Sequence, residues 1–162
     1  MLPILFCAAL IAIDQLSKYL AYTLLKPVGS LAIIEGVFSL TYVENQGAAF
    51  GLFQGARWFF IVITILIMGG IVYFYRGLPR ERAYGKARFT LLLIASGALG
   101  NFIDRFRQGY VVDFFHASFI DFPVFNIADS CVVIGTILFI ILYLFVYKAG
   151  ETSKNQEEPE GL

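Results

Sequence analysis

Four stretches of this sequence are each long and apolar enough to cross a lipid bilayer, which takes about 20 mostly apolar residues. They run from about residue 2 to 25, 58 to 75, 89 to 106 and 126 to 147. Of the 162 residues, 59% are apolar and 15% are charged, whereas a soluble domain has about 45–50% apolar and about 25% charged residues. A soluble or disordered chain is therefore excluded. We expect an all-α membrane protein, with residues 1–150 forming one four-transmembrane-helix bundle.

The charged residues are balanced in number but unevenly distributed. Twelve Lys and Arg residues face twelve Asp and Glu residues, which argues against a nucleic-acid partner. The short connection between the second and third spans carries one acid and five basic residues: Arg76, Arg80, Arg82, Lys86 and Arg88. Because basic loops stay in the cytoplasm, this connection and both termini are predicted to be cytoplasmic. Residues 151–162 then form a polar cytoplasmic tail.

The connection between the first two spans, residues 27–56, contains a strand-like segment. Val37–Val43 is rich in β-branched and aromatic residues with partial alternation, which is typical of a strand. The segment 47–51 follows, where glycines permit tight turns. We expect a small extracytoplasmic β-containing subdomain between helices 1 and 2, with an ordinary surface hairpin as the alternative.

Polar side chains of three spans gather at one depth of the predicted bundle. At about 1.5 Å of rise per residue, they fall near the outer leaflet, on the same side as the last connection. The set comprises Asp14, Lys18, Asn101, Asp104, Arg105, Asp113, Asn126 and Asp129. A charge at the bilayer centre costs about 2.5–3.5 kcal/mol, so such residues are functional candidates. Two simpler interpretations remain: Asp14 and Lys18 can neutralise each other as an i,i+4 pair, and Arg105 can link helices.

The reactive side chains narrow the chemistry. Cys7 and Cys131 lie in apolar runs, and together with the single histidine they are too few for a zinc site. We place His116 in a loop among apolar neighbours, so Ser96 has no base to activate it. We therefore expect no metal and no cofactor, and carboxylate chemistry remains.

Asp113 and Asp129 both have apolar neighbours and both can reach the outer-leaflet side. Two carboxylates a few ångströms apart share a proton and titrate as a pair. The ionised partner can then activate water while the protonated one donates to a peptide carbonyl, as in aspartic proteases. A small proton- or ion-coupled membrane carrier using the same acids is the alternative, because acids also mark transport paths.

Five short motifs follow one another along the chain. They are Asp14-Gln15-x-x-Lys18, Asn45-x-Gly47-Ala48-Ala49-Phe50-Gly51, Gly97-Ala98-x-Gly100-Asn101-x-x-Asp104-Arg105, Val111-Val112-Asp113-Phe114 and Phe125-Asn126-x-Ala128-Asp129. In this order, and with this length and four-span layout, the sequence resembles the lipoprotein signal peptidase family, also called signal peptidase II.

The resemblance implies an intramembrane aspartic endopeptidase of the bacterial cytoplasmic (inner) membrane. Such an enzyme removes the signal peptide from diacylglyceryl-modified prolipoproteins by cutting just before the lipidated cysteine. The family's two aspartates correspond to Asp113 and Asp129. Substrate-binding or dyad-support roles fall on six residues: Asn45, Asn101, Arg105, Asn126, Asp14 and Gly47. The resemblance also implies sensitivity to globomycin.

The substrate is already in the bilayer, so we expect a cleft that opens sideways to membrane lipid at the outer leaflet. In this hypothesis Arg105 and the asparagines position peptide carbonyls. The turn 47–51 closes over the lipidated segment as a flap. We expect the chain to act as a monomer.

Overall fold

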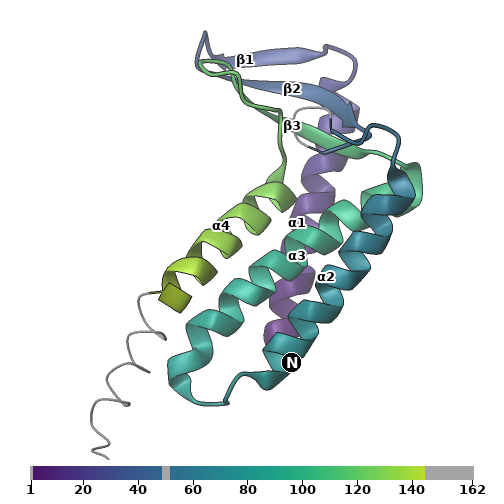
Figure 1. The fold of residues 1–162 in the computed structure, drawn as a ribbon. Helices are drawn as coiled ribbons and strands as arrows, with labels where there is room; N and C mark the ends of the chain where they lie inside the picture. The colour runs from purple at the N-terminus through teal and green to yellow at the C-terminus, as the bar shows by residue number, and fades with distance from the viewer. Residues whose placement is uncertain (1, 49–51, 145–162) are drawn as a thin grey trace, which may run out of the picture.

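The structure is a computed structural model that describes residues 2–48 and 52–144. Four α-helices form a bundle, and a small sheet lies across one end of it (Figure 1). Helix α1 spans Leu2–Leu20 and continues as a π-helical turn over Ala21–Leu25, and the others are α2 (Arg57–Gly77), α3 (Gly85–Gln108) and α4 (Ile127–Leu142). The expected tail 151–162 and residues 49–51 of the expected flap lie outside the described residues.

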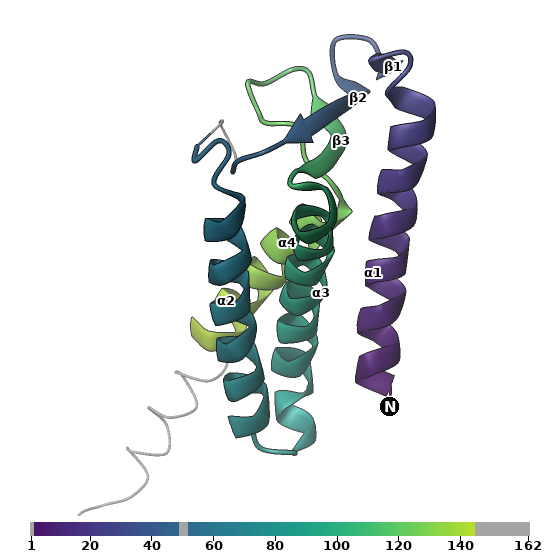
Figure 2. The ribbon, with the colours of Figure 1, turned by 90° about the vertical axis from the view of Figure 1, so that its right-hand side faces the viewer.

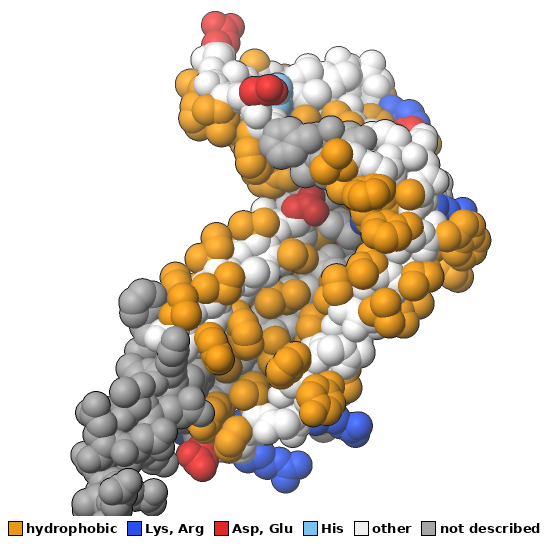
Figure 3. Space-filling view, viewed as in Figure 1, with side chains coloured by type: hydrophobic (Ala, Val, Ile, Leu, Met, Phe, Trp, Pro, Cys, Tyr) orange, Lys and Arg blue, Asp and Glu red, His pale blue; other side chains and the backbone are white. Residues whose placement is uncertain are grey.

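Within the described residues, three helices are long and apolar enough to cross a membrane: Leu2–Leu25, Arg57–Gly77 and Gly85–Gln108. Helix α4 is apolar as well but is described over 16 residues. Residues 145–147 of the expected fourth span, 126–147, lie outside the described residues. Large apolar side chains of α2 and α4 are exposed on the surface (Figure 3), as expected where lipid replaces water as the solvent.

Helix α3 packs against all three of the other helices. Small residues let α4 in particular approach it closely. A Cβ atom at Gly97 would lie 2.2 Å from the backbone oxygen of Ala128 in α4. A Cβ atom at Gly135 of α4 would lie 2.8 Å from Cγ1 of Ile94 in α3. Small residues are the usual means of bringing two membrane helices together, since lipid provides no hydrophobic drive between them.

The sheet has three antiparallel strands in the order β1-β2-β3. Strands β1 (Ser30–Ile34) and β2 (Phe38–Asn45) come from the connection between α1 and α2, where the sequence predicts a β-containing subdomain. Strand β2 covers most of the predicted segment Val37–Val43, whereas β1 was not predicted. The third strand, β3 (Val111–Ala117), comes instead from the connection between α3 and α4. Figure 2 shows the sheet capping the end of the bundle where α1 and α3 finish.

The chain enters β3 through a sharp reversal at the end of α3. Gly109 closes the helix with φ +86°, a left-handed conformation that favours glycine. Strand β3 then begins with four consecutive buried residues, Val111 to Phe114. Buried on both faces, this part of the strand carries Asp113 into the interior between the sheet and the helices.

Candidate active site

Asn126 joins two aspartates at the start of α4. It is the N-cap of the helix and is fully buried. Its side-chain oxygen accepts from the Asp129 backbone N–H at 2.9 Å, and its own backbone N–H donates to Asp129 Oδ2 at 3.1 Å. This reciprocal capping box leaves the Asn126 side-chain amide free to donate to Asp113 Oδ1 at 2.6 Å. One residue therefore holds Asp113 and Asp129 within a single hydrogen-bonded unit.

Asp113 is buried, with 2% of its surface exposed. Asn45, at the end of β2, donates from Nδ2 to Asp113 Oδ2 at 2.9 Å, while its own Oδ1 accepts from the Gly47 backbone N–H. Burial, followed by the negative charge of nearby Asp129, raises the pKa of Asp113 to about 7. This carboxyl group can therefore carry a proton near neutral pH.

Asp129 lies in the first turn of α4, where the helix dipole favours a negative charge. Its Oδ1 accepts from Asn101 Nδ2 of α3 at 2.7 Å. Unlike Asp113, its side chain is partly exposed. In Figure 3 an acidic side chain is visible in the hollow between the sheet and the helices.

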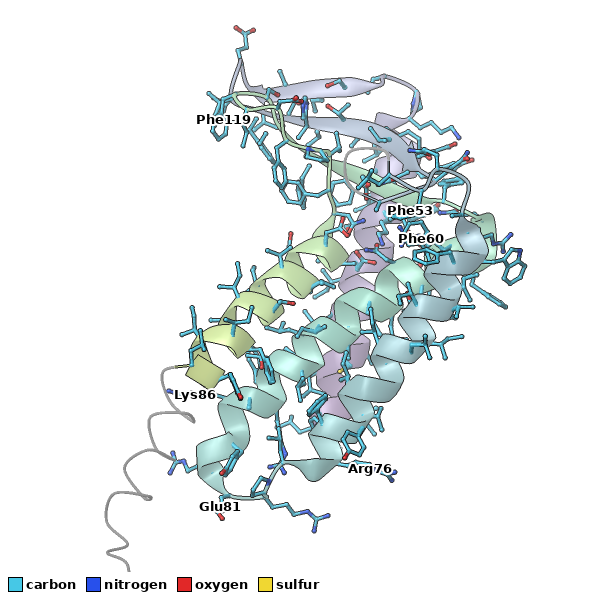
Figure 4. The ribbon with its side chains drawn as sticks, viewed as in Figure 1. Phe53, Phe60, Arg76, Glu81, Lys86 and Phe119 are labelled. Carbon is cyan, nitrogen blue, oxygen red and sulfur yellow. The ribbon has the colours of Figure 1, made fainter. Side chains whose placement is uncertain are left out.

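Arg105 of α3 connects the segment after β2 to α2. Its Nη2 donates to the backbone oxygen of Gly47 at 2.8 Å, and its guanidinium lies 4.5 Å from the ring centre of Phe60. Figure 4 labels Phe60 at the end of α2 that lies next to the sheet. The sequence gives no indication of a role for Phe60, because an aromatic side chain in an apolar span is not distinctive.

A second polar cluster lies beside the first, between α1 and α3. Asp14 and Lys18 form the expected i,i+4 pair at 2.8 Å, but Lys18 also lies 3.1 Å from Asp104 Oδ2. Gln15 donates to Asp104 Oδ1 at 3.0 Å. Asp14 does more than neutralise Lys18, because its Oδ1 accepts from the Ala128 backbone N–H at 2.9 Å. Gln15 and Asp104 belong to the sequence motifs, but the sequence assigns neither of them a catalytic or support role.

The structure thus brings the two predicted catalytic aspartates and the six predicted support residues to one region, next to the sheet. One placement from the sequence is wrong: His116 lies on strand β3 rather than in a loop, because β3 pairs with β2 along its length. Its Nδ1 is within hydrogen-bond distance of Ser39 and Ser118. Ser96 is buried and donates to the Leu92 backbone oxygen. No group of three His, Cys, Asp or Glu side chains that could hold a metal occurs in the described parts of the chain.

Two carboxyl groups in one hydrogen-bonded unit at the end of a membrane helix bundle are an arrangement that fits an aspartic peptidase. Comparison with known proteins specifies which one. Residues 6–145 match the family model described as signal peptidase (SPase) II. The chain belongs to the lipoprotein signal peptidase family, aspartic peptidases that process prolipoproteins, and is a multi-pass bacterial membrane protein.

Individual relatives agree with this assignment over nearly the whole chain. The lipoprotein signal peptidase of Caldanaerobacter subterraneus subsp. tengcongensis is 47% identical over 150 residues, covering 92% of this chain and 99% of that protein. The lipoprotein signal peptidase of Streptococcus pyogenes serotype M5 is 44% identical over 132 residues, covering 82% and 86%. A solved structure described as a bacterial membrane enzyme superposes with a TM-score of 0.79 at 38% identity, covering 99% of this chain and 94% of that one.

Proposed function

We propose that Asp113 and Asp129 are the catalytic pair of this peptidase. The observation that carries the proposal is that Asn126 hydrogen-bonds to both carboxyl groups. Ionised Asp129 takes a proton from water, and the water oxygen bonds to the peptide carbonyl carbon while Asp113 donates its proton to the carbonyl oxygen. The resulting tetrahedral intermediate breaks its C–N bond as the nitrogen receives a proton from the pair. The products are a free carboxyl group and a free amine.

The asparagines support the pair in this scheme. Asn45, Asn101 and Asn126 all direct their side-chain NH₂ groups at a carboxylate oxygen. One N–H of each is therefore engaged with the two acids, which favours dyad support. Arg105 and Gly47 are tied to each other, and through them the end of β2 is held against α3.

The site is proposed to face the outer leaflet of the cytoplasmic membrane. The sheet and the basic connection lie at opposite ends of the bundle, as the labels Arg76, Glu81 and Lys86 in Figure 4 make visible. The positive-inside rule then puts the connection, and both termini, in the cytoplasm. The substrate is a prolipoprotein with a diacylglyceryl group on its cysteine, cut just before that cysteine. Its lipid and signal helix stay in the bilayer while the peptide bond enters the hollow beneath the sheet.

The test is cleavage of a diacylglyceryl-modified prolipoprotein by the purified protein in lipid, compared with the unlipidated form. We expect cleavage of the lipidated form, inhibition by globomycin, no effect of EDTA or thiol blockers, and activity as a monomer. Flux of protons or ions through liposomes without a peptide product would support the carrier instead. Equal cleavage of both forms would contradict the proposed specificity.

A further inference from the structure

Lys18 of α1 makes more contacts than charge neutralisation requires. Its side chain is 3% exposed. The ammonium lies 2.8 Å from Asp14 Oδ2, 3.1 Å from Asp104 Oδ2 and 2.9 Å from the side-chain oxygen of Asn101. An ammonium group has three donors and no acceptor, so each N–H of Lys18 has its own oxygen. The third oxygen belongs to an uncharged side chain, and that contact carries the inference.

The contact with Lys18 favours one orientation of the Asn101 amide. An asparagine side chain offers an oxygen that accepts and an NH₂ group that donates. Because Lys18 can only donate, Asn101 keeps its oxygen toward α1, where Asn126 also donates to it at 3.2 Å. The NH₂ group then points the other way and donates to Asp129 Oδ1 at 2.7 Å. Turned over, the amide would set its NH₂ group against an ammonium and its oxygen against a carboxylate.

Each of the two carboxylates that hold Lys18 accepts from the backbone N–H of the residue that precedes one of the two proposed catalytic acids. Asp14 accepts from the N–H of Ala128, the residue before Asp129. Asp104 accepts from the N–H of Val112, the residue before Asp113, at a longer 3.4 Å. A Cβ atom at Gly100 would lie 2.6 Å from Asp14 Oδ2, so the absence of a side chain there lets this carboxylate approach. Lys18 thus lies at the centre of a buried network that ends at both acids.

We propose that Lys18 is a positioning residue for the peptidase reaction. This role depends on the catalytic pair proposed above. Lys18 orients the Asn101 amide so that the ionised form of Asp129 receives a hydrogen bond. Lys18 itself does not touch the substrate. Hydrogen bonds to charged groups are the stronger ones, so loss of this one from the reacting state predicts a fall in kcat of roughly tenfold or more.

The experiment compares kcat and KM of the wild type with those of Lys18→Met, which keeps the aliphatic chain and removes all three donors. We expect kcat per folded enzyme to fall at least tenfold while KM changes little. The matched control is Lys26→Met, since Lys26 forms an exposed ion pair with Glu44 and surface pairs contribute little. Unchanged kcat per folded enzyme in Lys18→Met, with only a lower Tm, would show a purely structural role and overturn the proposal.

A double-mutant cycle tests the route through Asn101. If Lys18 acts by orienting this amide, Lys18→Met should change kcat less than about twofold in an Asn101→Ala background. The full effect of Lys18→Met in that background would contradict the route. Should Lys18→Met fail to fold, Lys18→Met/Asp104→Asn keeps the summed formal charge of Lys18, Asp14 and Asp104 at −1. Its kcat is then compared with that of Asp104→Asn alone, so that the difference reports the loss of Lys18. Absence of cleavage by the wild type would overturn the catalytic pair and this role together, whereas wild-type cleavage with an unaffected lysine variant overturns this role alone.

Discussion

The side-chain amide of Asn126 lies 2.6 Å from Oδ1 of Asp113, and both residues are buried. The two belong to different elements, since Asn126 caps α4 and Asp113 lies on β3. The same asparagine binds Asp129 through its backbone and side chain. This one residue therefore links the two acids across the two elements.

Replacing either acid of the pair should abolish cleavage. Asp113→Asn and Asp129→Asn keep the side-chain volume but remove the group that donates or takes the proton. We expect loss of cleavage of a lipidated prolipoprotein to background, with membrane insertion unchanged when measured by extraction and protease accessibility. Substantial residual turnover in one variant would remove that residue from the pair.

Asn126→Ala should reduce both activity and stability. The substitution removes a helix N-cap, which contributes about 1 kcal/mol, and leaves buried Asp113 without one of its donors, which costs about 1–3 kcal/mol more. We expect the Tm in detergent to fall and kcat to fall more strongly than KM rises. A variant with wild-type Tm and kinetics would contradict the joining role of Asn126.

The activity should fall as the pH rises past about 7. Burial and the charge of Asp129 raise the pKa of Asp113 to about 7, and the reaction requires its protonated form as the acid. The linked effect on folding has a definite sign, because a raised folded-state pKa stabilises the protein below the unfolded value near 3.9 and this stabilisation is lost as pH rises toward 7. A pH profile of kcat/KM checks the fall in activity. Measuring Tm against pH in wild type and Asp113→Asn checks the loss of folding stability. A profile flat from pH 6 to 9 would contradict the assignment.

Gly97→Ala should loosen the contact between α3 and α4. The new Cβ atom would meet the backbone oxygen of Ala128 at 2.2 Å, and backbone cannot turn aside as a flexible side chain can. We expect a destabilisation of about 1–3 kcal/mol and lower activity, because Ala128 precedes Asp129. Gly69→Ala on α2 is the control, since nothing lies within 4 Å of its Cβ position. Equal Tm values for the two variants would show that the close contact does not matter.

Relationships within one helix could be predicted from the sequence, because helix geometry is the same everywhere. The spacing of Asp14 and Lys18 predicts their ion pair, and the spacing of Asn126 and Asp129 predicts that they face the same way. The constant rise per residue likewise brings the polar side chains of three spans to one level. The length and apolar character of the spans establish a membrane bundle without further information.

Only the tertiary structure decided which polar groups of different elements meet. The pairing of β3 with β2 brings Asn45 to Asp113, 68 positions along the chain, and no periodicity in the sequence specifies that register. Helix packing adds Asp104 to the pair of Asp14 and Lys18, and directs Asn101 toward Asp129. Composition and spacing determine whether each segment lies in lipid or in water, and whether it forms a helix or a strand. Partners across segments depend on how closely the backbones approach, which is decided by residues such as Gly97 and Gly100 only once the helices are packed together.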